Sequence, residues 1–106
     1  MRKIESQMIQ AIRNQKDWRS GNTQVETTDG VSKVYLHNNL IATITSYGVR
    51  LFDGGWQTVT TKSRLNAIIN GLMDGVKYGV FQRDFQWYVQ DDGQENAFWN
   101  GYVLTF

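Results

Sequence analysis

Three turn-like dipeptides recur nine residues apart in the first half of the chain. They are Asp29-Gly30, Asn38-Asn39 and Tyr47-Gly48, and the seven-residue runs between them are rich in Val, Ile, Thr and Tyr. Seven strand residues followed by a two-residue turn is the period of an antiparallel meander. The chain has ten glycines and no proline, so glycine, asparagine and aspartate must mark its sharp turns. Residues 23–52 are therefore predicted to form four sequential antiparallel strands.

The sequence determines only part of the register of this meander. Two-residue turns place Val25, Val34, Thr43 and Phe52 in one cross-strand row, and they place Glu26 opposite Lys33, which is a favourable charge pair. Neither face of the predicted sheet is uniformly apolar. Two alternatives follow: either both faces are covered, or a bulge shifts the register of the later strands.

An amphipathic helix is predicted on each side of the meander. In the first, from Arg2 to about Lys16, apolar residues recur at helical spacing, and the helix ends before Ser20, Gly21 and Asn22. The second begins with Thr60 or Thr61 as its cap and ends near Gly75. The residues predicted to form the apolar faces are Ile4, Met8, Ala11 and Ile12 in the first helix and Leu65, Ile68, Ile69 and Leu72 in the second.

Three shorter strands are predicted at the C-terminal end, over residues 78–82, 85–90 and 102–106. In the middle one Phe85, Trp87 and Val89 alternate with polar residues, which is typical of a half-buried strand. An acidic loop, residues 91–96, precedes the last strand. The predicted fold is thus α+β in a single domain of residues 1–106: an N-terminal helix, a four-stranded antiparallel meander, a second helix, then three shorter strands.

The residue counts exclude several kinds of chemistry. The chain has no cysteine, which excludes disulfides, thiolate metal sites and a cysteine nucleophile, and its single histidine, His37, excludes a histidine cluster. No carboxylate lies at a motif spacing from His37, and the acidic loop lacks the alternating ligands of a calcium loop. No P-loop or dinucleotide fingerprint is present. We therefore expect a protein that is not an enzyme and has no cofactor or metal. No apolar run predicts a membrane span.

The start of the second helix carries residues suited to binding an anion. Lys62 and Arg64 stand at the positive end of the helix dipole, where cations are unfavourable unless they meet an anion such as phosphate. Hydroxyl groups and an aromatic residue just upstream could add hydrogen bonds and base stacking. The candidate nucleic-acid-binding residues are Trp56, Thr61, Lys62, Ser63, Arg64 and, on the preceding strand, Arg50. The simpler alternative is that both cations are solvated and Trp56 fills the core.

Charge and aromatic content add two further indications. Residues 1–64 hold nine cations and five acids, a net charge of +4, whereas residues 65–106 hold two cations and five acids, a net charge of −3. This asymmetry indicates one basic and one acidic face, unless the two halves interleave on folding. Fourteen aromatic residues are many for one small core, so an exposed aromatic patch is expected.

Several stretches of the chain carry a family resemblance. MRKIESQMIQAIRN, GVSKVYLHNNLIATI, LFDGGWQTVTTKSRLNAIIN and GVFQRDFQWYV resemble a recurrent family of small accessory proteins of tailed phages, particularly marine and cyanobacterial ones. The most specific block runs from Leu51 to Ile68. The resemblance implies a phage accessory protein in the cytoplasm of the bacterial host. It carries no catalytic or ligand-binding residue over to this chain.

Two functions compete at this point. The first is a non-catalytic phage protein that binds nucleic acid through the basic helix start and aromatic residues. The alternative is a host-takeover or anti-defence protein that inhibits a bacterial protein by direct binding, through aromatic anchor residues. A net charge of only +1 weakens the first hypothesis.

Overall fold

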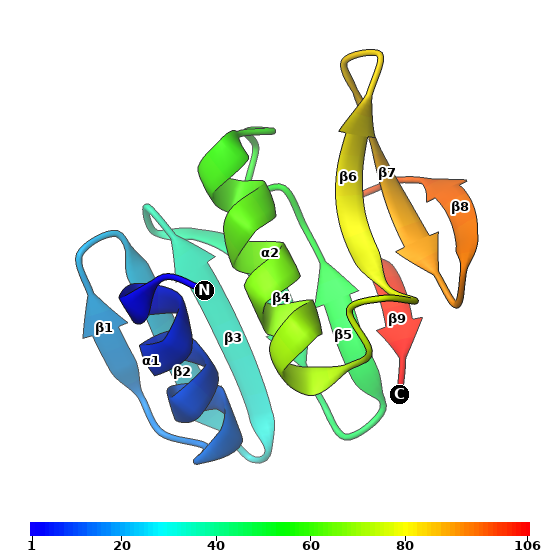
Figure 1. The fold of residues 1–106 in the computed structure, drawn as a ribbon. Helices are drawn as coiled ribbons and strands as arrows, with labels where there is room; N and C mark the ends of the chain where they lie inside the picture. The colour runs from blue at the N-terminus through cyan, green and yellow to red at the C-terminus, as the bar shows by residue number, and fades with distance from the viewer.

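The computed structural model describes residues 1–106 as two helices and nine strands in two antiparallel sheets (Figure 1). The larger sheet has the strand order β1-β2-β3-β4-β5-β9, and the smaller has the order β6-β7-β8. The predicted α+β class is confirmed. The elements are α1 (Lys3–Arg13), β1 (Trp18–Ser20), β2 (Thr23–Thr28), β3 (Val31–Leu36), β4 (Asn39–Ile44), β5 (Gly48–Leu51), α2 (Val59–Leu72), β6 (Gly79–Arg83), β7 (Gln86–Asp91), β8 (Gln94–Ala97) and β9 (Tyr102–Thr105).

The four predicted strands of the meander are β2 to β5, and no helix interrupts them. Asp29 and Gly30 form the first turn with positive φ values of 53° and 78°. The predicted pairs Val25–Val34 and Glu26–Lys33 are present. The next two turns lie one residue earlier than predicted. The second turn is His37-Asn38, in which both residues have positive φ, because asparagine and histidine tolerate the left-handed region better than most residues.

A bulge in β4 resolves the ambiguous register. Val34 pairs with Ala42 and Tyr35 pairs with Leu40, so Ile41 is the extra residue. The predicted pairing of Val34 with Thr43 is therefore wrong by one residue. The bulge compensates for the earlier turn and turns Ala42 and Ile44 toward the helices, where both are buried.

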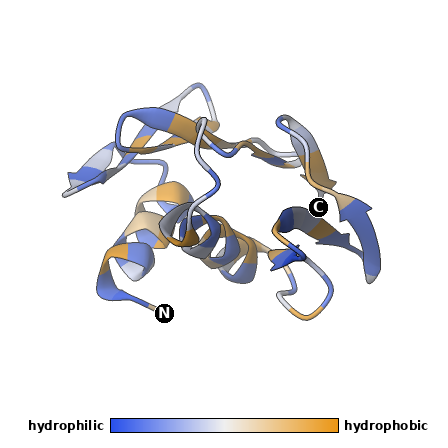
Figure 2. Ribbon diagram, turned by 90° about the horizontal axis from the view of Figure 1, so that it is seen from above, coloured by the Kyte–Doolittle hydropathy of each residue, from blue (hydrophilic) through white to orange (hydrophobic).

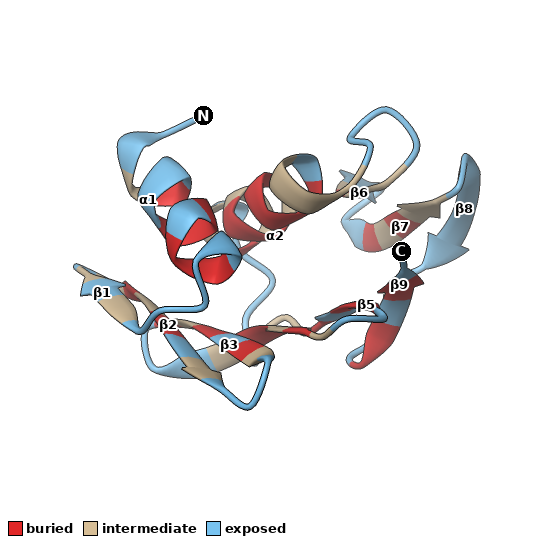
Figure 3. Ribbon diagram, turned by 90° about the horizontal axis from the view of Figure 1, so that it is seen from below, coloured by how far each residue is buried: buried red, intermediate tan, exposed pale blue.

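Both helices cover the same face of the larger sheet, which gives a two-layer molecule (Figure 2). The buried residues of the helices face the sheet, as Figure 3 shows. Leu65, Ile68 and Ile69 are fully buried as predicted, and Leu72 is partly buried against the same core.

α2 ends at Leu72, three residues before Gly75, and α1 ends at Arg13. The segment after α1 forms β1, a short edge strand that the sequence pattern did not predict.

The C-terminal segment forms four strands rather than three. The predicted acidic loop is a hairpin, because Asp92 and Gly93 adopt positive φ values of 52° and 83° and β8 follows them. β8 consists of polar residues and alanine, so hydrophobic alternation gave no indication of it. β9 returns to the larger sheet and pairs with β5.

Candidate functional site

The start of α2 is capped by Thr58. Its hydroxyl oxygen accepts a hydrogen bond from the Thr61 backbone N–H at 3.0 Å, so neither Thr60 nor Thr61 is the cap. The Thr61 hydroxyl lies 2.9 Å from the Thr58 hydroxyl and also bonds the Trp56 carbonyl, and the Thr61 residue is only 3% exposed. Thr61 therefore stabilises the helix start from inside and has no free group to offer a ligand.

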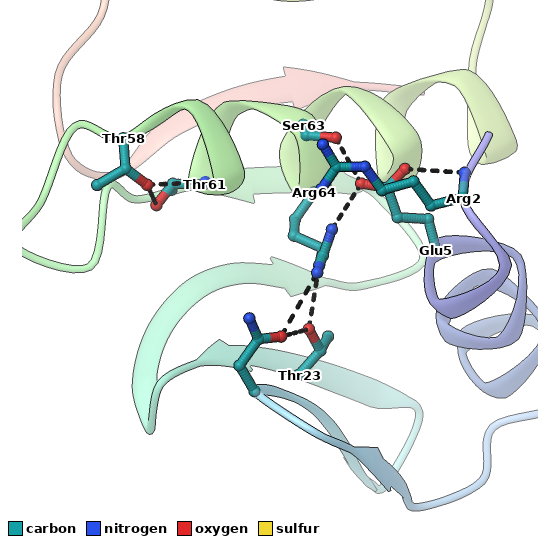
Figure 4. A network of polar contacts seen from close by, with 8 residues as sticks. Arg2, Glu5, Thr23, Thr58, Thr61, Ser63 and Arg64 are labelled. Atoms are coloured by element: carbon teal, nitrogen blue, oxygen red, sulfur yellow. Dashed lines mark hydrogen bonds and ion pairs between the residues drawn. The ribbon is translucent and has the colours of Figure 1, made fainter.

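Arg64 lies in the interior, at the contact between α2, α1 and the sheet (Figure 4). Its Nη1 atom donates to Glu5 Oε2 at 2.9 Å, and its Nε atom donates to Thr23 Oγ1 at 3.0 Å. Ser63 Oγ donates to the same Glu5 oxygen at 2.6 Å. No buried side-chain nitrogen or oxygen lacks a partner. Arg64 and Ser63 are thus engaged in a structural network that joins both helices to β2.

Glu5 is the charged partner that makes this burial possible. Burial raises the pKa of its carboxyl group, but hydrogen bonds from Ser63 and Arg64 outweigh that effect and hold the pKa below its ordinary value. Glu5 is therefore ionised at neutral pH. An arginine at 3% exposure would be highly unfavourable without such a counter-charge.

Trp56 and Lys62 remain accessible at the surface near the start of α2. Trp56 is 70% exposed, so it does not fill the core, and it borders a hollow of about 290 Å³ between the loop before α2 and the β3–β4 turn. His37, Asn39 and Asp53 line the same hollow. Lys62 Nζ contacts Gln82 Oε1 at 3.3 Å. The hollow thus combines an aromatic wall with polar groups, although the nearest carboxylate, Asp53, disfavours a phosphate.

Arg50 lies on the other face of the larger sheet. Its neighbours Val49 and Leu51 are buried toward the helices, and because successive side chains in a strand alternate, Arg50 points away from them. The predicted set of six residues is therefore divided. Trp56 and Thr61 line the hollow before α2, whereas Lys62 lies against Gln82 of β6. Arg50 is on the sheet face turned away from the helices, and Ser63 and Arg64 make internal contacts.

The β6–β7 hairpin presents the most exposed aromatic side chain of the molecule. Its two-residue turn consists of Asp84 and Phe85, with φ values of 52° and 66°. Phe85 is 93% exposed and belongs to the turn rather than to the half-buried strand in which it was predicted. Such a turn favours Asn-Gly or Asp-Gly, because the left-handed region is unfavourable for a residue with a Cβ.

Side-chain contacts across β6, β7 and β8 support the stem of this hairpin. Phe81 and Tyr88 stack with ring centroids 5.6 Å apart, and the Arg83 guanidinium lies over both rings at 5.6 and 5.0 Å. Arg83 Nη2 also forms an ion pair with Glu95 Oε2 at 3.0 Å. These contacts orient the tip of the hairpin and leave Phe85 without a neighbour that buries it.

Asn66 fixes the hairpin to the rest of the molecule. Its side-chain amide donates to the Val80 carbonyl and accepts from the Val80 N–H, both at 2.8 Å, in the manner of a neighbouring strand. Trp87 and Val89, the predicted inward residues of β7, are buried on the inner face. Phe85 was missed because Asp-Phe is not a turn dipeptide and because Phe85 continues the alternation of Trp87 and Val89.

No three His, Asp or Glu side chains lie close enough together to hold a metal ion. Neither helix has the length and apolar character needed to cross a membrane.

Comparison with known proteins gives one match. Residues 1–105 match the model of the family described as Kyanoviridae Gp96 protein, which confirms the resemblance to a family of small phage proteins. No curated protein and no solved structure matches the chain.

Proposed function

The chain belongs to the Kyanoviridae Gp96 family of cyanophage proteins, and we propose that it is a non-catalytic binding protein that acts on a protein of its bacterial host. It binds by direct contact in the host cytoplasm, with the tip of the β6–β7 hairpin as its anchor. The observation that carries the proposal is Phe85, a large apolar side chain that is 93% exposed in a turn that disfavours it.

Stability alone gives no reason for phenylalanine at this position. The left-handed backbone costs a residue with a Cβ about 1–2 kcal/mol, and the exposed ring recovers almost nothing by burial. Strained residues that the surrounding structure holds in place are concentrated at binding and active sites. Aromatic side chains are also the residues that most often dominate the energy of a protein interface. Both observations support a role for Phe85 in contact with a partner.

The stem defines what the partner must offer. Phe85 requires an apolar pocket deep enough for one phenyl ring. Arg83 and Glu95, whose side chains are about half exposed, flank that pocket with one charge of each sign. Because these contacts form the stem before a partner binds, less ordering is needed on binding.

Immobilised protein can be incubated with host lysate, and the captured proteins can be compared between the wild type and Phe85→Gly. Glycine suits the turn, so this variant keeps the hairpin while it removes the anchor. We expect a host protein that the wild type captures and Phe85→Gly does not. Tyr47→Ser, which removes another exposed aromatic residue, is the matched control and should capture it normally. Equal capture by the wild type and Phe85→Gly would refute the proposal.

Nucleic-acid binding is the second candidate, and the observation that favours it is Trp56, which is 70% exposed and borders the hollow before α2. Single-stranded DNA would then bind with an affinity that falls as salt rises. The Lys62→Gln variant should make the slope of log affinity against log salt shallower by about 0.7, the contribution of one phosphate contact. Trp56→Ala should weaken binding by about 1–3 kcal/mol without changing that slope. No binding at low salt would eliminate this candidate.

A further inference from the structure

β9 has one edge that pairs with no other strand. It lies at the end of the larger sheet and pairs only with β5. In an antiparallel pair, alternate residues direct their N–H and C=O groups toward the partner strand. The Phe106 N–H donates to the Tyr47 carbonyl, so Phe106 and Leu104 are the residues whose backbone groups face β5. The backbone groups of Val103 and Thr105 therefore point away from the sheet.

These outward groups have no partner within the chain. No backbone or side-chain hydrogen bond outside the β5–β9 ladder involves Val103 or Thr105. Val103 is 38% exposed, and Thr105 is also exposed. From Gly101 to Phe106 the chain has no charged residue and no proline, the features that normally protect an open edge. The opposite edge strand, β1, is only three residues long and carries Arg19.

β8 has a matching open edge in the smaller sheet. The Phe98 N–H donates to the Trp87 carbonyl, and the same alternation directs the backbone groups of Glu95 and Ala97 away from β7. No strand pairs with that side of β8. Ala97 and Val103 line one hollow of about 590 Å³, so the end of β8 and the start of β9 border the same hollow.

Tyr102 crosses the hollow and joins its two sides. Its hydroxyl group donates to Asp91 Oδ2 at 2.9 Å and accepts from Asn96 Nδ2 at 3.0 Å. Trp99, 58% exposed, stands beside it with ring centroids 5.4 Å apart. Asp91 is the only charged residue that lines the hollow, and its Oδ1 atom makes no hydrogen bond in the chain.

We propose that this groove between β8 and β9 binds an extended polypeptide segment that carries basic side chains. The segment adds as a strand to the edge of β9, where Val103 and Thr105 supply two N–H donors and two carbonyl acceptors. A basic side chain reaches Asp91, and an apolar side chain contacts Trp99. A basic segment matches the free Asp91 Oδ1 atom, whereas the β9 edge of a second copy of this protein carries no basic side chain between Gly101 and Phe106.

This site goes beyond the proposed function and does not depend on it. The groove uses Asp91 at the end of β7, β8, β9 and the segment between the last two strands, whereas the hairpin uses Phe85 at its tip. A failed peptide experiment would leave the Phe85 proposal intact, and failed capture by the hairpin would leave this one intact.

The probe is an acetylated and amidated peptide of eight alternating lysine and valine residues, added to uniformly ¹⁵N-labelled protein. We expect its addition to shift the amide resonances of Ala97 and Val103 and to slow hydrogen exchange at Val103 and Thr105 by about tenfold or more, because free amides become ladder hydrogen bonds. A peptide with glutamate in place of lysine should bind much more weakly. Equal binding of both peptides, or no shift at Ala97 and Val103, would overturn the proposal.

Val103→Pro removes the outward N–H without removing a bond of the β5–β9 ladder, since proline is tolerated on edge strands where the N–H faces solvent. It should abolish peptide binding, whereas Val103→Thr should preserve it. If Val103→Pro does not fold, a peptide N-methylated at alternate residues replaces it, and this peptide should not bind the wild type. Exchange at Val103 that slows with protein concentration in the absence of peptide would identify a second copy as the occupant and overturn the proposal.

Discussion

Replacing Phe85 by glycine should make this protein more stable, although it deletes a large apolar side chain. The wild-type residue has φ 66°, which costs about 1–2 kcal/mol in a residue with a Cβ. Glycine removes that strain but gives the unfolded chain more conformational freedom, which offsets about 0.5–1 kcal/mol. Only 7% of the residue is buried, so the lost contacts contribute little. The net expected gain is about 0.5–1 kcal/mol.

Urea unfolding followed by tryptophan fluorescence measures this free-energy change, and thermal unfolding measures the matching change in Tm. A gain of that size should raise Tm by about 2–8 °C, because 1 kcal/mol shifts a domain of this size by about 4–8 °C. The matched control is Tyr47→Gly, which replaces a 79% exposed aromatic residue in a turn where φ is not positive. That change should lower stability by about 0.5–1 kcal/mol, since glycine relieves no strain there. If Phe85→Gly lowers stability as much as Tyr47→Gly does, the reasoning from strain is wrong.

Three further predictions concern the scaffold. Leu65→Ala, at a fully buried position of α2, should cost about 2–5 kcal/mol in chemical unfolding, and a loss below about 0.5 kcal/mol would contradict the packing described for α2. Gly48→Ala should cost about 3 kcal/mol or more, because a Cβ at Gly48 would lie 2.0 Å from the Leu104 carbonyl oxygen. The lowered pKa of Glu5 stabilises the fold above the ordinary value of 4.5, and this stability is lost as pH falls through the lower folded-state pKa. Glu5→Gln should therefore be less stable at neutral pH and should lose stability less steeply in acid, as pH-dependent unfolding can measure.

Local turn chemistry explains why the meander could be predicted from the sequence. Asp29-Gly30 combines the two residue types that a tight hairpin favours, and the strands on both sides of it pair in the predicted register. Prediction failed by one residue at His37-Asn38, because three consecutive polar residues allow two positions for the turn. Only the bulge at Ile41 reconciles that turn with burial of Ala42 and Ile44, and a bulge leaves no local pattern in the sequence.

Long-range contacts explain why the candidate site was harder to predict. Arg64 stands 59 residues from Glu5 in the chain, so no spacing rule relates the two side chains. The helix also begins at Val59 rather than after Thr60 or Thr61, which places Arg64 in the second turn and on the buried face. Its burial removes one of the two cations expected to bind phosphate. The exposure of Trp56 follows from a loop conformation that hydrophobic periodicity does not report.

The placement of charge predicts how a partner should associate. The cations of the first half lie on both sides of the larger sheet: Arg13 is on α1, whereas Lys33 and Arg50 are on the strand faces turned away from the helices. Both proposed contact regions, the Phe85 hairpin and the β8–β9 groove, belong to residues 65–106, whose net charge is −3. A protein that contacts this region should therefore present a basic surface around its apolar pocket.

Raising the salt concentration should slow association of the captured host protein, because screening weakens electrostatic steering. Dissociation should change little with salt, because an apolar anchor controls it. A dissociation rate that rises with salt as steeply as the association rate falls would show that charge, and not Phe85, holds the complex together.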